Sequence, residues 1–439
     1  MKKISGLIAA CFFCFFSSLK AQISVEVISM EPQSGQYNYF GVRVTVEQAP
    51  VNNITVNGFI YDEGSPNTNH PFTLVIYSGT TSAETATNFY QTGPANNASA
   101  EIRTLSSAYA GANVVFDLQA NMLKFNSVYD VNAILDQLEI DYETYNTNYE
   151  NQYPGYTAAQ LDDMDEQNNF DQFKPFKDFE NLFPGFYSKR AEVENIENTW
   201  LSNNFTGADP DDTDLTFDDA LNTIFNGSNS FKAGNSVYQL TANGMYIDGI
   251  LNEDVGTVAL KTYDLKPEPL FTYEYSFFSP VAFRGGPSID FTPVNIEEAM
   301  STPCKSNKKS KKDTTFDNDT KRAKFKVSIT SIAFRSGVGG KVVYYKRKNN
   351  GNWKNTRTDM AVTCGGTIYN GNCATSLQFS DRKPISGYKK RNRISTRRWT
   401  QSGFPSIPSN DIIWKTYSNY IGMGFDLSGL ATGSLALTF

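Results

Sequence analysis

Charge is divided between two distant stretches of this chain, and that division limits how the chain can fold. Residues 131–220 carry 21 Asp and Glu against four Lys and Arg, whereas residues 301–400 carry 24 Lys and Arg against five acids. Side chains of one sign repel one another when they are crowded together. Each stretch therefore has to expose its charges to water or to pack them against the opposite charge.

Three arrangements satisfy this requirement, and the sequence leaves all of them open. The acidic and basic parts can dock on each other within one chain. The basic part can instead bind an anionic partner, such as lipopolysaccharide or an acidic glycan; nucleic acid is the less natural ligand outside a cell. Both parts can also be solvated faces whose charges are screened beyond about 8 Å at physiological salt.

The first 21 residues predict export. Lys2 and Lys3 precede an apolar run over residues 4–16, and a small residue, Ala21, precedes Gln22. This is the layout of a secretory signal peptide that is cleaved after Ala21. We therefore expect a secreted protein, extracellular or in the cell envelope, with no transmembrane helix, because the run is too short to span a bilayer.

A lipid anchor is the alternative for this terminus. The residues before Cys11, Ile-Ala-Ala, formally fit a bacterial lipobox, which would make the chain a lipid-anchored envelope protein. The apolar run continues past Cys11 through residues 12–16, which favours plain cleavage.

Beyond the signal peptide, the hydrophobic pattern predicts a mainly β, multidomain protein with an α-helical insert. Phe40, Val42, Val44 and Val46 alternate with smaller or polar residues, which is the period of a half-buried strand. The expected domains are an N-terminal β-sandwich of immunoglobulin or fibronectin type III class over residues 22–108, an acidic helical domain followed by β-hairpins over 128–262, a connector over 264–320, and a basic, sandwich-like β domain over 322–439.

Cap and turn signals place the elements of the acidic domain. We expect helices that begin at Asp130, at Thr157 and at Thr216, and a further helix that contains Trp200. Asn and Gly pairs at 234–235 and 243–244 predict two hairpin turns. Residues 64–67 have loop composition, and the lysine-rich stretch 305–312 is expected to end the connector.

The basic β domain shows the same period. Phe325, Val327 and Ile329 alternate with Lys324, Lys326 and Ser328. The alternation predicts a strand at the start of this domain.

No catalytic residue is assigned from the sequence. His70 is the single histidine, which argues against a multi-histidine zinc site, and its surroundings indicate a surface or turn residue. Adjacent acids occur at 162–163, 165–166 and 218–219, and a glycosidase needs two carboxyls roughly 5–10 Å apart. An extracellular, carboxylate-dependent hydrolase is therefore the alternative to a non-catalytic protein.

Two weaker features complete the set of candidate sites. Asp209, Asp211, Asp212 and Asp214 offer oxygen ligands for calcium, although the stretch lacks the Gly and Glu of an EF-hand loop, and helix capping explains the acids equally well. Lys389, Lys390, Arg391 and Arg393 form a basic cluster that suits an anionic polymer.

The cysteines add one structural expectation. Cys364 and Cys373 flank a loop with an Asn-Gly turn, so we expect them to form a disulfide bond in an oxidising compartment. Cys304 is then the odd cysteine of the mature chain, either free or paired with another chain.

Several stretches resemble secreted proteins of Bacteroidota-type bacteria. VNGFIYDEG (56–64), HPFTL (70–74) and FYQTGP (89–94) resemble β-sandwich modules of their large secreted proteins. ALNTIFNG (220–227), VYQLTANG (237–244) and residues 341–373 are similar to uncharacterised secreted proteins of the same group. The resemblance implies an N-terminal immunoglobulin- or fibronectin-like module but no assigned reaction. We therefore expect a secreted or surface-exposed, non-catalytic protein that acts in binding, adhesion or assembly.

Overall fold

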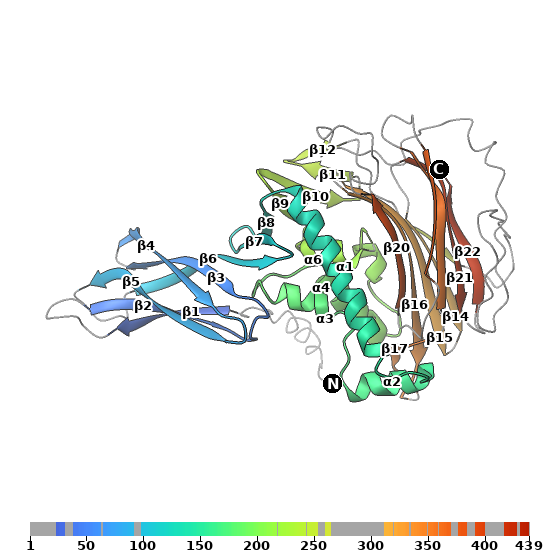
Figure 1. Ribbon diagram of the computed structural model, residues 1–439, viewed down its shortest axis with the longest axis horizontal. Coiled ribbons are helices and arrows are strands. Elements are labelled where there is room, and N and C mark those ends of the chain that lie inside the picture. Colours follow the sequence, from blue (N-terminus) through green and yellow to red (C-terminus); the bar gives the residue numbers. More distant parts are fainter. Residues whose placement is uncertain are drawn as a thin grey trace, which may run out of the picture. The chain divides into compact units, whose positions relative to one another are not determined.

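The computed structural model describes residues 23–30, 38–62, 65–91, 98–216, 218–242, 244–252, 260–264, 311–318, 320–332, 335–348, 350–358, 360–369, 376–383, 391–399, 417–427 and 431–438 (Figure 1). The fold is mainly β with a few helices, as expected. Two compact units divide the chain. One comprises Met1–Ala108, Val115–Asn121 and Asp178–Phe186, and the other comprises Tyr109–Val114, Met122–Lys177 and Tyr187–Phe439.

The N-terminal unit contains two groups of antiparallel strands. The first has the order β1-β2-β5 and consists of β1 (Ile23–Met30), β2 (Asn38–Val46) and β5 (Ser82–Gln91). The second has the order β4-β3-β6 and consists of β3 (Ile54–Asp62), β4 (Ser65–Ile76) and β6 (Ala98–Tyr109). The predicted alternation in β2 is confirmed, because Phe40, Val42, Val44 and Val46 are all buried.

The loop predicted around residues 64–67 is shorter in the structure. Strand β4 already begins at Ser65, and His70 lies within it opposite Ile60 of β3. Pro66 and Pro71, which lack the backbone N–H of a central strand, are tolerated because β4 is the outer member of its group. His70 is therefore a strand residue, not a turn residue.

Six helices lie in the acidic segment. They are α1 (Val128–Glu150), α2 (Ala158–Gln167), α3 (Lys174–Glu180), α4 (Lys189–Ser202), α5 (Pro210–Thr213) and α6 (Asp219–Ile224). Thr157 caps α2, as predicted, and the structure adds a reciprocal capping box with Gln160. Two predicted caps are wrong by a few residues. Ser127, not Asp130, caps α1, and Asp218, not Thr216, caps α6. In both cases a side chain two or three residues from the predicted one reaches the free N–H groups.

Short strands flank these helices. Strand β7 (Ala112–Asp117) follows β6, and β8 (Met122–Phe125) precedes α1. In the second unit the order β8-β9-β10-β11-β12 includes β9 (Ser230–Ala233), β10 (Ser236–Thr241), β11 (Gly244–Ile247) and β12 (Ile250–Asn252). The hairpin turn at Gly234 and Asn235 is confirmed by the pairing of Ala233 with Ser236. The next turn ends one residue earlier than predicted, since Gly244 already pairs with Thr241.

The basic segment forms two further sheets. The first has the order β13-β14-β15-β16-β17, with β20 also paired to β16, and consists of β13 (Leu260–Asp264), β14 (Lys311–Asn318), β15 (Lys321–Ile332), β16 (Arg335–Arg347), β17 (Trp353–Asn355) and β20 (Arg391–Trp399). The second has the order β19-β18-β21-β22 and consists of β18 (Met360–Tyr369), β19 (Ser376–Lys383), β21 (Tyr417–Leu427) and β22 (Ala431–Thr438).

One end of the predicted connector is part of this fold. Strand β14 begins at Lys311 and pairs with β15 over eight positions, from Lys311 opposite Ser328 to Asn318 opposite Lys321. Lysine occurs in solvated linkers but also on edge strands and at solvent-facing strand positions. The lysine-rich composition therefore did not distinguish this strand from a linker.

An aromatic core joins the helices to the first of these sheets. Trp200 and Leu201 of α4 are buried against Val343 and Tyr345 of β16, and Phe205 and Trp353 pack around them. The rings of Phe205 and Trp353 have centroids 4.6 Å apart. Figure 1 shows α4 and β17 in the same part of the second unit. Burial of these large side chains fixes the acidic helices next to the basic sheet.

Candidate functional site

The acidic helices meet the basic strands through buried ion pairs, and the first of these surrounds Lys324. The ammonium nitrogen of Lys324, on β15, lies 2.7 Å from both carboxylate oxygens of Asp209 and 3.0 Å from Oδ2 of Asp211. The lysine side chain is 3 % exposed and that of Asp211 is 1 % exposed. The same nitrogen lies 4.2 Å from the centre of the Trp200 ring, within the range of a cation–π contact.

Local structure explains how the two acids reach the lysine. Asp209 is the N-cap of α5, and its Oδ1 accepts a hydrogen bond from the backbone N–H of Asp211 at 2.9 Å. Proline at position 210 fixes the first turn of this short helix. The cap thereby holds both carboxylates on the same side, toward β15.

A second ion pair is centred on Arg357, two residues after β17. Its guanidinium binds Asp165 of α2 with two parallel hydrogen bonds, Nε to Oδ2 at 2.8 Å and Nη2 to Oδ1 at 3.0 Å. Nη1 also donates to Glu150 of α1 at 3.0 Å, and the backbone N–H of Arg357 donates to Asp162 at 2.9 Å. Such a fork is a strong and geometrically specific interaction.

Aromatic rings line the Arg357 pair and exclude water. The guanidinium carbon lies 5.4 Å from the Phe170 ring centre and 5.8 Å from that of Tyr149, and these two rings stack at 3.8 Å. Burial lowers the pKa of Arg357, but the hydrogen bonds and charges of Asp165 and Glu150 outweigh it and raise the pKa above its ordinary value. Burial also raises the pKa of Tyr149 to about 12, so the phenol is neutral at physiological pH.

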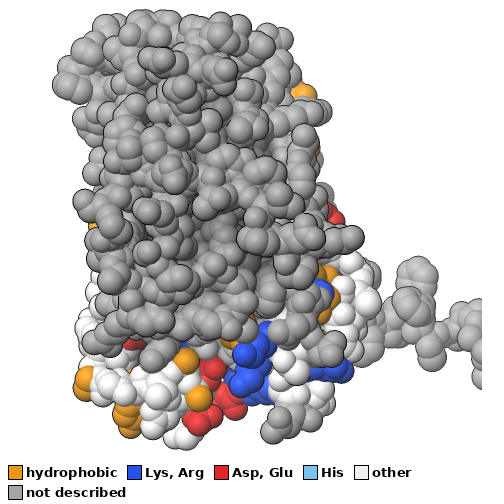
Figure 2. Space-filling view, turned by 90° about the vertical axis from the view of Figure 1, so that its right-hand side faces the viewer, with side chains coloured by type: hydrophobic (Ala, Val, Ile, Leu, Met, Phe, Trp, Pro, Cys, Tyr) orange, Lys and Arg blue, Asp and Glu red, His pale blue; other side chains and the backbone are white. Residues whose placement is uncertain are grey.

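A third contact is more exposed. Glu166, the residue after Asp165, binds the ammonium groups of both Lys348 and Lys354, the latter at 2.5 Å. Hydrogen bonds from Lys348 and Lys354 lower the pKa of Glu166 to about 2. Figure 2 shows Lys and Arg side chains beside Asp and Glu side chains at the lower end of the visible face. The adjacent acids on α2 thus bind different partners: Asp165 binds a buried arginine, and Glu166 binds two half-buried lysines.

A neutral donor adds to these ion pairs within the aromatic core. The hydroxyl of Tyr345, fully buried on β16, donates to Oε1 of Glu197 on α4 at 2.5 Å. Arg322 of β15 stacks on the Phe205 ring at 3.7 Å from its centre. The core between helices and sheet is therefore polar as well as aromatic.

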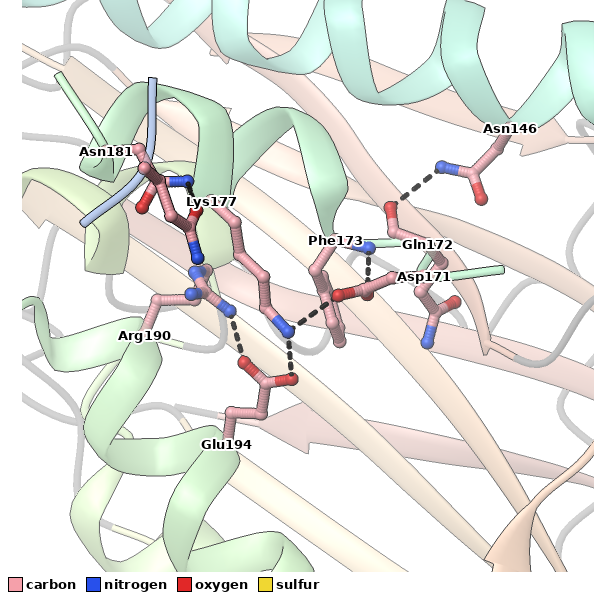
Figure 3. A network of polar contacts seen from close by, with 9 residues as sticks. Asn146, Asp171, Gln172, Phe173, Lys177, Asn181, Arg190 and Glu194 are labelled. Carbon is pink, nitrogen blue, oxygen red and sulfur yellow. Dashed lines mark hydrogen bonds and ion pairs between the residues drawn. The ribbon is translucent and has the colours of Figure 1, made fainter. Parts of the chain in front are cut away.

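A separate network ties the helices to one another (Figure 3). Lys177 of α3 lies between Asp171 and Glu194, with its ammonium nitrogen 2.6 Å and 2.8 Å from their carboxylates. Glu194 of α4 also accepts a bond from Arg190 at 2.7 Å. Two cations and two carboxylates thus alternate, which places every one of these charges next to an opposite charge.

The four aspartates predicted as calcium ligands do not converge on one point. Asp209 and Asp211 bind Lys324, Asp214 accepts bonds from Asn222 and from the backbone of Thr216, and Asp212 is exposed. Among the residues that the structure describes, no group of three or more His, Cys, Asp or Glu is placed to hold a metal ion. A lysine ammonium occupies the position between the first two acids.

The adjacent acids considered for hydrolase chemistry are engaged in the structure. Asp162, Asp165 and Glu166 bind residues of the basic segment, as given above. Asp218 caps α6 and accepts from the backbone N–H of Leu221 at 2.9 Å, and Asp219 is largely buried in the first turn of the same helix. These carboxylates are used for packing and capping.

The remaining predicted residues lie mostly beyond what the structure describes. Lys389, Lys390, Cys304 and Cys373 are outside the described residues, as is the stretch 1–21. Arg391 and Arg393 belong to β20, where they pair in register with Val343 and Lys341 of β16. Cys364 belongs to β18 and pairs in register with Asp381. The Cys364–Cys373 disulfide stays a prediction.

Two residues that dominate this interface were not predicted from the sequence. Lys324 belongs to an alternating strand pattern that identifies no partner for it, and α4 and α5 cover its side chain and supply its partners. Arg357 stands in a polar stretch, NTRTD (355–359), with no periodic signal. The opposite net charges of the two segments are the one sequence signal that predicts such pairs. Net charge does not identify the residues that form them.

Comparisons with known proteins add little to this description. No family model matches the chain, and no curated protein matches it. A solved structure of a DUF4848 family protein from Bacteroides thetaiotaomicron VPI-5482 is similar at 9 % identity and a TM-score of 0.14, covering 74 % of this chain and 100 % of that chain. No helix among the described residues has both the length and the apolar character that crossing a membrane requires.

Proposed function

We propose that this chain is a secreted or surface-exposed, non-catalytic protein that acts in binding or assembly. The observation that carries the proposal is the use of its clustered carboxylates. Asp165, Glu166, Asp209 and Asp211 each bind a Lys or Arg of the segment 324–357. A carboxylate that acts in hydrolysis has to face its substrate, whereas these carboxylates face cations of the same chain.

The same contacts support docking of the acidic helices on the basic β region. Buried pairs such as Arg357–Asp165 are well suited to fixing one arrangement of two packed parts, because breaking one leaves an uncompensated charge. The aromatic core around Trp200 and Tyr345 supplies the apolar part of this contact. In this proposal, the separation of acidic and basic residues along the sequence serves first to dock the acidic helices on the basic β region of the same chain.

Binding of an anionic polymer is the second part of the proposal. Its basis is the cluster of basic residues at the start of β20 and just before it in the sequence, Lys389, Lys390, Arg391 and Arg393. Lipopolysaccharide and acidic glycans are the anionic polymers that such a surface would meet outside a cell.

An immunoglobulin- or fibronectin-like sandwich is our proposal for the N-terminal unit. The support is its two groups of antiparallel strands, β1-β2-β5 and β4-β3-β6, with buried side chains alternating along β2. A disulfide between Cys364 and Cys373 and cleavage after Ala21 belong to the same picture of an exported protein.

A binding assay with the full mature chain tests the ligand part. Replacing Lys389, Lys390, Arg391 and Arg393 with Gln should weaken binding to heparin and to lipopolysaccharide at least tenfold at low salt. The matched control replaces four other cations, Lys174, Lys232, Lys346 and Arg347, with Gln. Equal losses in both variants, or no binding by the wild type, would refute the assigned surface.

The non-catalytic part is tested by turnover. The purified mature chain should show no activity on a panel of glycans and peptides. Activity that disappears when one of the paired acids is replaced, for example in Asp218→Asn, would establish a carboxylate-dependent hydrolase instead.

A further inference from the structure

The surroundings of Lys324 contain the groups that amide formation between two side chains requires. An amine and a carboxyl group must touch, and a neighbouring acid must move protons between them. Nζ of Lys324 lies 2.7 Å from both oxygens of Asp209, so the amine is in contact with the carboxyl it would attack. Residues 209 and 324 are 115 positions apart, and the fold alone brings them together.

A second acid stands where a proton relay is needed. Oδ2 of Asp211 lies 3.0 Å from the same nitrogen, and the Asp211 side chain is 1 % exposed. Asp209 is 34 % exposed, which leaves a path for a departing water molecule. The two carboxyls therefore differ in their surroundings: one is buried beside the amine, and the other is open on one side.

Two further groups favour the reaction over a simple ion pair. The Trp200 ring, 4.2 Å from the nitrogen, covers the site on one side and excludes water from it. The backbone N–H of Asp211 donates to Oδ1 of Asp209 at 2.9 Å, at the oxygen where negative charge develops when an amine adds to the carboxyl carbon. Exclusion of water also makes the separated charges of an ion pair expensive relative to a neutral product.

We propose that Lys324 and Asp209 form an intramolecular isopeptide bond, with Asp211 as the residue that transfers the protons. Proton transfer within the ion pair gives a neutral amine and a carboxylic acid. The nitrogen then adds to Cγ of Asp209, Asp211 carries a proton from the nitrogen to the departing oxygen, and the C–O bond breaks. One amide bond forms and one water molecule leaves, with no oxidant, reductant or other reactant.

The bond would close a long loop between the acidic and basic segments. It would tie α5 to β15 covalently, next to the aromatic core of Trp200 and Tyr345. A cross-link of this kind resists unfolding because it restricts the unfolded chain. The proposal does not depend on any ligand of the protein or on its proposed function.

Mass spectrometry of the intact wild-type chain tests the proposal directly. The purified mature chain, residues 22–439 with its cysteines reduced, should be lighter than the mass of that sequence by one water, about 18 Da. Peptide mapping should recover a branched peptide in which Lys324 is joined to Asp209. A chain of full sequence mass, with both peptides recovered unlinked, would overturn the proposal, and a cross-link to Asp211 would overturn the assignment of roles.

Three variants assign the roles. Lys324→Arg keeps a cation at the site but should restore the full sequence mass. Asp211→Asn should slow the loss of water at least tenfold, measured as the linked fraction over time after synthesis. Asp212→Asn, which changes the exposed neighbour, should lose water as the wild type does, and an equal slowing in the Asp211 and Asp212 variants would refute the relay.

Discussion

The Arg357 guanidinium and the Asp165 carboxylate face each other edge to edge, with Nε–Oδ2 and Nη2–Oδ1 distances of 2.8 Å and 3.0 Å. Both side chains are almost fully buried, at 2 % and 1 % exposed. The pair joins a residue near the middle of the basic segment to a helix of the acidic one. It is therefore the contact by which docking of the two segments is best measured.

Arg357→Met should destabilise the second unit by about 3–5 kcal/mol, because Asp165 then remains buried without its partner. Urea denaturation followed by tryptophan fluorescence measures this, since all four tryptophans of the chain lie in that unit. Arg347→Met is the matched control, because Arg347 is exposed. A loss no larger than that of the control would contradict the assigned role.

A second substitution separates the loss of the Arg357–Asp165 attraction from the cost of leaving the Asp165 carboxylate buried without its partner. Asp165→Asn combined with Arg357→Met should recover part of the stability lost in Arg357→Met alone, because no buried carboxylate is left. Additive losses in the double variant would mean that the two side chains do not interact in solution.

Glu166 should make stability depend on pH in the acid range. Its pKa is lowered from 4.5 to about 2 in the folded protein by Lys348 and Lys354. The group therefore stabilises the fold above pH 4.5, and this contribution disappears as the pH falls toward 2. Because the side chain is 47 % exposed, solvent screening limits the effect, and we expect Glu166→Gln to cost under about 1 kcal/mol at pH 7.

The pH dependence is checked by denaturation of the wild type and Glu166→Gln between pH 2 and pH 7. The difference between them should shrink as the pH falls from 5 to 2, and it should also shrink as salt is added. Asp163→Asn, on an exposed position of the same helix, serves as control. A difference that stays constant over the whole range would exclude the two lysine contacts.

Tyr345→Phe should cost about 1–3 kcal/mol, because it removes the hydroxyl that donates to the buried carboxylate of Glu197. The shape of the side chain is otherwise kept, so the aromatic core should remain packed. Tyr129→Phe, at a residue that is 59 % exposed, should change the tryptophan transition by less than about 0.5 kcal/mol. Equal effects in the two variants would argue against a polar role for Tyr345.

Gly58→Ala should destabilise the N-terminal unit by at least about 1–3 kcal/mol. A Cβ atom at this position would lie 2.1 Å from the backbone oxygen of Glu101 and 2.6 Å from the Phe72 ring, so the strands would have to separate. The N-terminal unit contains no tryptophan, so circular dichroism should register the change while the tryptophan transition stays the same. Gly227→Ala, whose Cβ would be 3.5 Å from Glu192, is the control and should be close to neutral.

The sequence by itself determined the local elements of this protein. Period-two alternation in β2, the helix start at Thr157 and the turn at Gly234 and Asn235 each depend on residues a few positions apart, and the structure confirms all three. The predicted loop around Ser65 was too long, and the strand at Lys311 was missed. In both cases pairing with a neighbouring strand outweighed local composition.

Only the tertiary structure decided which charges meet. The sequence showed that residues 131–220 are acidic and that 301–400 are basic, and net charge says nothing about partners at particular positions. Lys324 stands in an alternating strand pattern that identifies no partner, and in the structure α5 and Trp200 bury it. Partners such as Asp165 and Arg357 stand 192 positions apart, and no local rule connects residues at that distance. Their pairing depends on tertiary packing, in which the aromatic core holds the helices against the basic sheet.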